Sequence, residues 1–519
     1  MPATALHEPH EVTQAEVAEK AKLKKHFGRF DILFFLICTI VGVDTIGAVA
    51  SKGATAFTWM IITIVIFFIP SALLFAELGT AIPEEGGPYV WVRLAFGRLA
   101  GAVNNFLYWV TNPVWLGGTL AVLAANVFAV FFLGGVTMSS VPWYAFTLAF
   151  VWIGVLSAIL SFRVGKWFPT IGAWARFLLL GGFSLSVVIY AIKNGVHGFG
   201  AGDFSVNYAG FIALLPILLF NFVGFELPNA AGDEMTDPQK DVPFSIARSA
   251  VASSLLYGLP ILGILIVLPK AQVTGLGGFT DAIKAVFTVY GGSVTSSGAS
   301  LTGAGALLGG IAAILFILAL LTSGVTWIMG SDRAMAVSAF DGAGPRSLGV
   351  ISSRFGTPVR VNVLSGVIST LVLIGAHQIV GGNAAKIFTA VLYLAISTTL
   401  VSYIGIFPAL FILRRRLPDL KRPYRAPAPL FLSGLLTVLI IFSVIQILMP
   451  GLGDAWFGSA YAISGWTKWG YFWTNLIPLL IFIAVGVAFW ALGGDTRRAV
   501  AVPDGPVSEP GSDSEMAMG

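Results

Sequence analysis

Three ionisable residues lie inside long apolar stretches of this sequence. Asp44 lies two residues after Gly42 in the first stretch, Glu226 lies near the end of a later one, and Arg176 lies well inside another. A charged side chain among apolar residues is costly, so it usually serves a ligand, a proton or a partner charge. Asp44 could hold an ammonium group, bind a proton, or cap an unwound turn of helix. Arg176 could pair with a buried acid or extend its charged end toward water.

The composition argues against a soluble enzyme. Apolar residues make up 56% of the 519-residue chain and charged residues only 11%, whereas soluble domains average about 25% charged residues. The single cysteine, Cys38, rules out a disulfide framework, and the five histidines show no metal-ligand spacing. A phosphate-binding loop and a nucleophile–base pair are both missing from the sequence. We therefore expect a membrane protein without a catalytic residue, a bound metal or a cofactor.

The elements that must position these residues are apolar segments long enough to cross a bilayer, which takes roughly 20 residues of helix. The segments are continuously apolar and do not alternate, which excludes a β-barrel. Twelve are found, near residues 30–50, 57–80, 100–133, 141–161, 168–192, 209–228, 249–269, 302–330, 361–380, 386–413, 428–449 and 471–492.

Loop charges predict the orientation of these segments. With both termini in the cytoplasm, 23 of the 30 lysines and arginines fall on the inner side, as the positive-inside rule requires. Residues 1–29 are then a cytoplasmic tail and residues 493–519 a disordered one. The basic stretch 414–425 directly follows an apolar segment, so topology and anionic lipid explain it better than nucleic acid does.

Two of the segments are interrupted at corresponding positions of two five-helix blocks, 30–192 and 209–413. The first is broken near Gly42 and Gly47, and the sixth near residues 221–224. An unwound turn frees backbone groups inside the membrane, where only a cavity or a ligand makes them tolerable. Such paired breaks indicate the binding site of a transporter.

Five groups of residues, in order along the chain, identify a family. They are AELGTAIPEEGGPY at 76–89; FNFVGFE at 220–226; DEMTDPQKDVP at 233–243; SDR at 331–333 with FDG at 340–342 and TP at 357–358; and RRR at 414–416 through RPYRAP at 422–427. Together they closely resemble the amino acid/polyamine/organocation (APC) permeases. The nearest branches are the amino acid permeases and the glutamate/GABA exchangers.

The resemblance implies an all-α polytopic membrane protein of LeuT type. Its twelve transmembrane helices would form a 5+5 inverted repeat plus two additional helices, 428–492. The sequence departs from the family pattern at the first break. A short Gly-x-Gly run is usual there, whereas here the glycines are separated and Asp44 lies between them.

The resemblance also implies a set of functional residues around the two breaks. Glu226 would be the proton-coupling acid near the inner gate, approached by the aromatic gate residues Tyr108 and Tyr403; the alternative is a structural acid bonded to a neighbouring hydroxyl. Phe220 would close over the substrate, and Arg176 would be a fixed cation where sodium-driven relatives bind sodium. Packing in the membrane is the alternative for each aromatic residue. The expected substrate-binding residues are Gly42, Val43, Asp44, Thr45, Asn112, Phe220, Asn221, Phe222 and Gly224. The expected gating or coupling residues are Tyr108, Glu226, Arg176, Ser323, Trp327 and Tyr403.

The function expected from this resemblance is secondary transport of amino acids or related amines across the cytoplasmic membrane by alternating access. Proton coupling is favoured over sodium coupling. The alternative is an exchanger of a substrate and its decarboxylated product; a polyamine importer and a non-transporting receptor come after it. Asp44 favours a basic amino acid or a polyamine, whereas Glu84 and Glu85 resemble a branch with acidic substrates, so the substrate stays open. Partners would be the substrate and the lipid bilayer, with no nucleic acid, and the chain could be a monomer or a homodimer.

Overall fold

The computed structural model describes residues 27–160, 167–196, 200–269, 272–295, 298–453 and 467–498, together with residues 19, 22 and 25. Most of both predicted tails lies outside the described residues. So do four of the basic residues used to predict the orientation, namely Lys20, Lys24, Arg163 and Lys166, and one of those placed outside, Lys270.

Long apolar helices dominate the described part of the chain, and ten of them are long and apolar enough to cross a membrane. Three contain a short π-helical segment: α4 (Ala54–Thr63)–η1 (Ile64–Phe68)–α5 (Ile69–Ala81), α7 (Arg98–Trp115)–η2 (Leu116–Leu120)–α8 (Ala121–Phe132), and α11 (Trp167–Arg176)–η3 (Phe177–Gly181)–α12 (Gly182–Asn194). The others are α9 (Ser140–Ile159), α14 (Pro238–Val267), α16 (Gly303–Phe340), α17 (Val359–Ile379), α18 (Ala384–Arg416), α19 (Pro429–Leu448) and α21 (Lys468–Leu492). The prediction of an all-α polytopic membrane protein is confirmed.

The two segments predicted to be interrupted are the first and the sixth, and both are. The first consists of α2 (Arg29–Ile40) and the short α3 (Ile46–Ala50), joined by an irregular stretch. The sixth consists of α13 (Tyr208–Asn221) and the 3₁₀ helix η5 (Leu227–Glu234). Each piece is short, so the number of twelve spans stays a prediction.

Two predicted helix ends were wrong. The eighth segment was expected to end near residue 330, but α16 continues to Phe340 and contains the buried residues Asp332 and Arg333. The seventh was expected to begin at 249, but α14 begins at Pro238. Apolar patterning ends a helix at the first charged residues, so it misses helical turns that carry charge, and it cannot foresee that Asp332 and Arg333 find buried partners.

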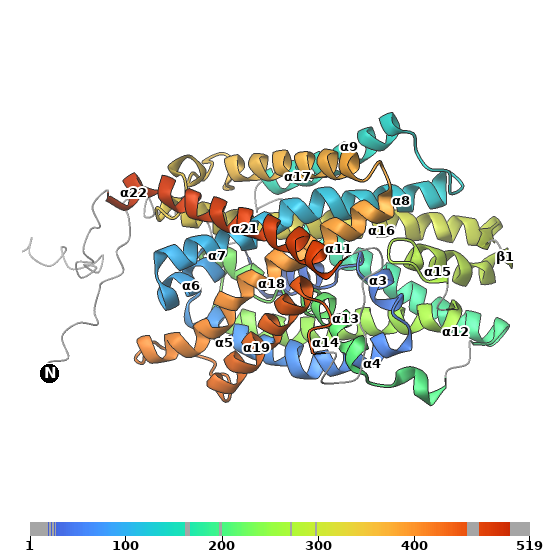
Figure 1. Ribbon diagram of the computed structural model, residues 1–519, viewed down its shortest axis with the longest axis horizontal. Helices are drawn as coiled ribbons and strands as arrows, with labels where there is room; N and C mark the ends of the chain where they lie inside the picture. Colours follow the sequence, from blue (N-terminus) through green and yellow to red (C-terminus); the bar gives the residue numbers. More distant parts are fainter. Residues whose placement is uncertain are drawn as a thin grey trace, which may run out of the picture.

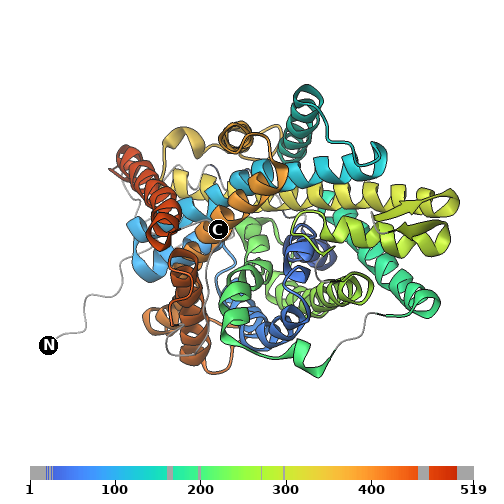
Figure 2. The same cartoon turned by 45° about the vertical axis from the view of Figure 1, so that its right-hand side comes forward.

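The remaining short elements connect the long helices along the chain, and several of them lie toward the two ends of the bundle. Figure 1 shows α6 and α22 toward one end, and α15 with the β1 hairpin toward the other. Seen from the second direction, the blue α2–α3 segment and the green α13 lie next to each other inside the bundle (Figure 2). The short elements are α6 (Pro88–Phe96), η4 (Ala201–Phe204), α15 (Gly278–Phe287), η7 (Thr288–Tyr290), the antiparallel β1 (Gly292–Thr295) and β2 (Gly298–Leu301), η8 (Arg346–Leu348) and α22 (Gly494–Arg498).

Candidate functional site

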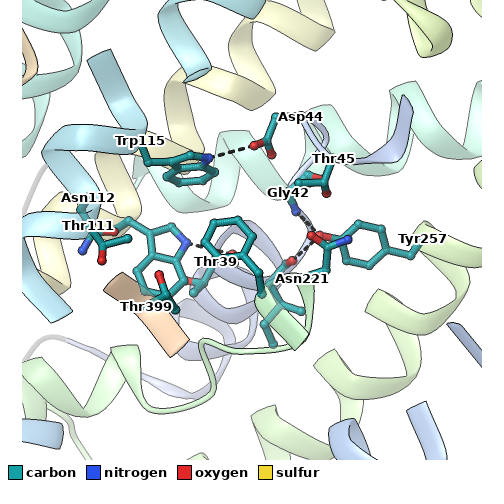
Figure 3. Close-up of a pocket in the computed structure, with 13 residues that line it drawn as sticks. Thr39, Gly42, Asp44, Thr45, Thr111, Asn112, Trp115, Asn221, Tyr257 and Thr399 are labelled. Carbon is teal, nitrogen blue, oxygen red and sulfur yellow. Dashed lines mark hydrogen bonds between the residues drawn. The ribbon is translucent and has the colours of Figure 1, made fainter. Parts of the chain in front are cut away.

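A small cavity lies between the two helix breaks (Figure 3). Residues of α2, α7, α13, α14, α16 and α18 line it. Seven of the predicted site residues are among them, namely Gly42, Asp44, Thr45, Asn112, Phe220, Asn221 and Trp327. Six further lining residues were not predicted, namely Thr39, Ile40, Thr111, Trp115, Tyr257 and Thr399.

Asp44 lies in the break between α2 and α3 and is 2% exposed. The indole Nε1 of Trp115, at the end of α7, donates a hydrogen bond of 2.8 Å to its Oδ2 (Figure 3). Its Oδ1 is buried and accepts no hydrogen bond from the described residues. A Cβ atom at Gly42 would lie only 2.8 Å from this Oδ1. The missing side chain at Gly42 therefore leaves the space that Oδ1 occupies.

The hydroxyl of Tyr257, on α14, bridges the broken end of α2. It accepts a hydrogen bond of 2.8 Å from the Gly42 amide and donates one of 2.9 Å to the carbonyl of Ile40. Both backbone groups lie where the regular helix has ended, so they would lack these partners without the hydroxyl. Tyr257 thus fixes the conformation of the break at the wall of the cavity.

Glu226 follows the second break and is fully buried. Its Oε1 accepts hydrogen bonds from Tyr403 at 2.5 Å and from Tyr108 at 2.9 Å, and its Oε2 accepts one from the Gly224 amide at 3.2 Å. The structure therefore brings together the acid and the two tyrosines that the sequence placed near one another. Their predicted role in coupling stays a prediction.

Arg176 is buried where α11 meets α2 and α16. Its Nε donates to the carbonyl of Val41 at 2.7 Å. Its terminal nitrogens donate to the carbonyls of Gly172 at 2.8 Å and Ala319 at 2.9 Å, to the hydroxyl of Thr322 at 3.2 Å, and to the hydroxyl of Ser323. These contacts use all five N–H groups of the guanidinium. All five acceptors are neutral carbonyl or hydroxyl oxygens. The guanidinium is therefore surrounded by oxygen atoms, as a bound metal cation would be.

Three aromatic rings surround one side of the cavity. The ring of Trp115 meets those of Phe220 and Trp327 edge-on, with centroids 6.2 Å and 6.5 Å apart. The Trp327 ring lies 6.2 Å from that of Tyr108, and its Nε1 donates to the Thr39 carbonyl at 3.0 Å. A continuous set of rings thus joins the cavity to the pair of tyrosines that hold Glu226.

Three predicted substrate-binding residues lie beside the cavity and do not line it. Val43 is buried, and Phe222 packs against Phe68 with centroids 4.7 Å apart. Gly224 has a φ of +122°, and a Cβ there would lie 2.6 Å from Cγ2 of Thr39. This conformation and this close approach explain why glycine occupies the position.

A buried cluster of charges lies at one end of the bundle. Arg333 of α16 donates to Oε1 of Glu85 at 3.3 Å, to Oε1 of Glu234, and to the Gly356 carbonyl at 3.3 Å. Burial raises the pKa of Glu85 well above its usual value, although Arg333 lowers it in part, and burial also raises the pKa of Glu234. The cluster joins α16 to η5 and to the loop before α6.

A second charge cluster surrounds Glu77, near the end of α5. Its carboxylate accepts hydrogen bonds from Arg414 at 2.8 Å and 2.5 Å and from the Ala426 amide at 2.7 Å. Nε of Arg422 lies 3.2 Å from Oε1 of Glu77. In the part of the chain that the structure describes, no cluster of His, Cys, Asp and Glu is suited to a metal ion.

Comparison with known proteins gives one family over most of the chain. The sequence model described as amino acid permease matches residues 27–467. A probable agmatine/putrescine antiporter, AguD of Lactococcus lactis, is 27% identical over 434 residues, which cover 82% of this chain and 87% of the relative. An uncharacterized transporter of Legionella pneumophila is 27% identical over 440 residues, covering 82% and 89%. The branched-chain amino acid permease BcaP of Bacillus subtilis is 23% identical over 455 residues, covering 83% and 90%.

Proposed function

We propose, from the premise that this chain belongs to the amino acid permease family, that it is a secondary carrier of amino acids or related amines that works by alternating access. The family and the relatives support an amino acid or amine transporter in general terms. The observation on which the specific proposal rests is the cavity between two interrupted helices, with the carboxyl group of Asp44 in its wall.

In this proposal the protein crosses the cytoplasmic membrane many times, with both termini in the cytoplasm. The buried cluster of Arg333, Glu85 and Glu234 would then close the cytoplasmic side. The many apolar helices support a multi-pass membrane protein, and the distribution of basic residues supports this orientation. Opening toward the cytoplasm would require Arg333 to release at least one of its two glutamates.

Proton coupling through Glu226 is part of the proposal. Neutral donors from Tyr108, Tyr403 and the Gly224 amide hold its carboxylate. A proton can therefore bind Glu226 without stranding a buried counter-cation. Sodium would not be needed, because the guanidinium of Arg176 already bonds to five oxygens between α2, α11 and α16.

Exchange is the second candidate function. One relative is described as a probable agmatine/putrescine antiporter. An exchanger needs only one site that binds two related molecules in turn, and the single cavity between the breaks meets that requirement. The two mechanisms differ in whether internal substrate is obligatory.

Transport by purified protein in liposomes tests the proposal. Labelled amino acids and amines are offered to vesicles that are empty or preloaded with the same compound, with and without an inward proton gradient. Gradient-driven, saturable accumulation into empty vesicles is expected from a proton-coupled carrier. Accumulation only into preloaded vesicles would favour exchange. No saturable transport of any amino acid or amine would overturn the proposal.

A further inference from the structure

The hydrogen-bond donors that face the cavity are mostly occupied by the protein itself. Trp115 donates to Asp44, Trp327 to the Thr39 carbonyl, and Tyr257 to the Ile40 carbonyl. The same is true of Asn112 and three threonines. Their donors go to the Tyr108 carbonyl for Asn112, the Phe35 carbonyl for Thr39, the Gly42 carbonyl for Thr45, and the Leu107 carbonyl for Thr111. Among the described lining side chains, the hydroxyl of Thr399 and the amide nitrogen of Asn221 are the donors without a hydrogen-bond partner, and both are neutral.

Two acceptors in the same cavity are free. Oδ1 of Asp44 and Oδ1 of Asn221 are both buried without a hydrogen-bond partner among the described residues. Asp44 is 2% exposed and Asn221 is 4% exposed. A buried acceptor without a partner is costly, so a bound ligand with N–H groups would relieve both.

The charge of the residues that line the cavity also favours a cationic ligand. Among the described residues that line the cavity, Asp44 is the only one with a formal charge, and none is a lysine, arginine or histidine. Arg176 lies behind the wall, where its Nε bonds to Val41, and its five N–H groups are occupied. It can offset part of the Asp44 charge, but it has no N–H group left for a ligand.

Trp115 orients the Asp44 carboxylate. Its 2.8 Å bond holds Oδ2, while the missing side chain at Gly42 leaves room for Oδ1. The ring of Trp115, with those of Phe220 and Trp327, supplies aromatic surface on the same side, which suits a cation.

We propose that Asp44, held by Trp115, makes this cavity selective for amine cations that carry no carboxylate group. The inference rests on the transport function proposed above and specifies its substrate class. An ammonium group in this cavity would pair with the Asp44 carboxylate. The carboxylate of a zwitterionic amino acid would instead lie in the same cavity as the Asp44 carboxylate, with no cationic side chain among the described lining residues to pair with it. Asp44 thus supplies the negative charge that an amino acid would otherwise bring.

Matched pairs of compounds test this selectivity. Binding to the purified full-length protein is measured by isothermal titration calorimetry for agmatine against arginine, putrescine against ornithine, and cadaverine against lysine. In each pair the decarboxylated amine is expected to bind at least about tenfold more tightly. Equal or tighter binding of the amino acids would overturn the inference while leaving amino acid transport intact. Failure of every compound to bind and to be transported would overturn the proposed function.

Variants assign the selectivity to its residues. Asp44→Asn is expected to weaken amine binding about 30-fold or more, because it removes the charge partner, and to leave amino acid binding within about threefold. Trp115→Phe keeps the charge but removes the indole donor, so it should reduce the amine preference by less than Asp44→Asn does. The control is Asp419→Asn, at an exposed aspartate after α18, which should retain the wild-type preference. If Asp44→Asn does not fold, the inference is tested by the wild-type affinity ratios and by Asp44→Glu. Asp44→Glu keeps the negative charge and should therefore keep the preference for amines. An Asp44→Asn protein with an unchanged amine preference would overturn the assignment.

Discussion

The hydroxyl of Tyr403 donates a hydrogen bond of 2.5 Å to Oε1 of Glu226, the same oxygen that accepts from Tyr108. These residues come from α18, α7 and the second helix break. A change in the protonation of Glu226 therefore alters contacts to two long helices at once. This geometry links a single proton to the packing of the bundle.

The first prediction concerns Glu226→Gln. The amide is nearly isosteric but cannot exchange a proton, so we expect uptake driven by a proton gradient to fall about tenfold or more. Exchange between preloaded and external substrate should stay within about threefold of wild type, because it needs no net proton movement. Both rates are measured in the same liposomes. Loss of exchange to the same extent would indicate that Glu226 is needed for folding or binding and not for coupling.

Glu77→Gln is the matched control for that substitution. Glu77 is also a buried glutamate, but its partners are Arg414, Arg422 and the Ala426 amide. Breaking a buried ion pair is destabilising by about 3 to 5 kcal/mol when one partner is removed. We therefore expect a lower melting temperature with an unchanged ratio of gradient-driven uptake to exchange.

The second prediction concerns Arg176 and sodium. Since its guanidinium occupies five acceptors between three helices, wild-type uptake should change by less than about twofold when choline replaces sodium. Arg176→Lys supplies only three donors, so this variant should be less stable and slower. Complete loss of wild-type uptake in choline would contradict the proposed sodium independence.

The fold was largely predictable because its determinants are local. A continuous apolar stretch specifies a helix, and the glycine near Asp44 together with the Asn221–Gly224 stretch marked both breaks. The end of α16 was not predictable, because Asp332 and Arg333 are charged residues that continue this helix into a buried region. The start of α14 was missed because its first turns carry the charged residues Lys240, Asp241 and Arg248. Asp332 accepts from Trp109, Asn362 and Ser365, and those partners lie far along the chain.

The site was predictable in part. Residues within the two breaks were found, since the breaks themselves are visible in the sequence. Trp115 and Tyr257 were missed because each lies in an uninterrupted apolar helix, where an aromatic residue usually packs. One available indication was that Trp115 follows Asn112 by three residues, which places both on one helix face. Nothing local indicates that the Tyr257 hydroxyl reaches Gly42, which is 215 residues away in the chain.

The third prediction concerns pH and the cluster of Arg333, Glu85 and Glu234. Burial raises the pKa of both glutamates in the folded protein, with Asp233 adding to the effect, although Arg333 opposes it. An acid whose pKa is raised by folding stabilises the fold below its unfolded pKa, and this contribution is lost as the pH rises through the folded value. The melting temperature should therefore fall as the pH rises above the ordinary glutamate pKa, and Glu85→Gln should flatten that fall. An identical pH profile in the variant would contradict the prediction.

The fourth prediction concerns the hydroxyl of Tyr257, which joins the Gly42 amide to the Ile40 carbonyl. Tyr257→Phe keeps the ring but removes the hydroxyl from both backbone groups, which then keep only the 2.9 Å hydrogen bond from the Gly42 amide to the Ile40 carbonyl. Each lost hydrogen bond is expected to cost about 0.5 to 1.5 kcal/mol. Because these groups adjoin Asp44, substrate affinity should fall together with the melting temperature. Tyr190→Phe is the matched control, since Tyr190 is half-buried on α12 away from the cavity, and it should change neither quantity. A Tyr257→Phe protein with wild-type stability and affinity would show that the break keeps its conformation without this bridge.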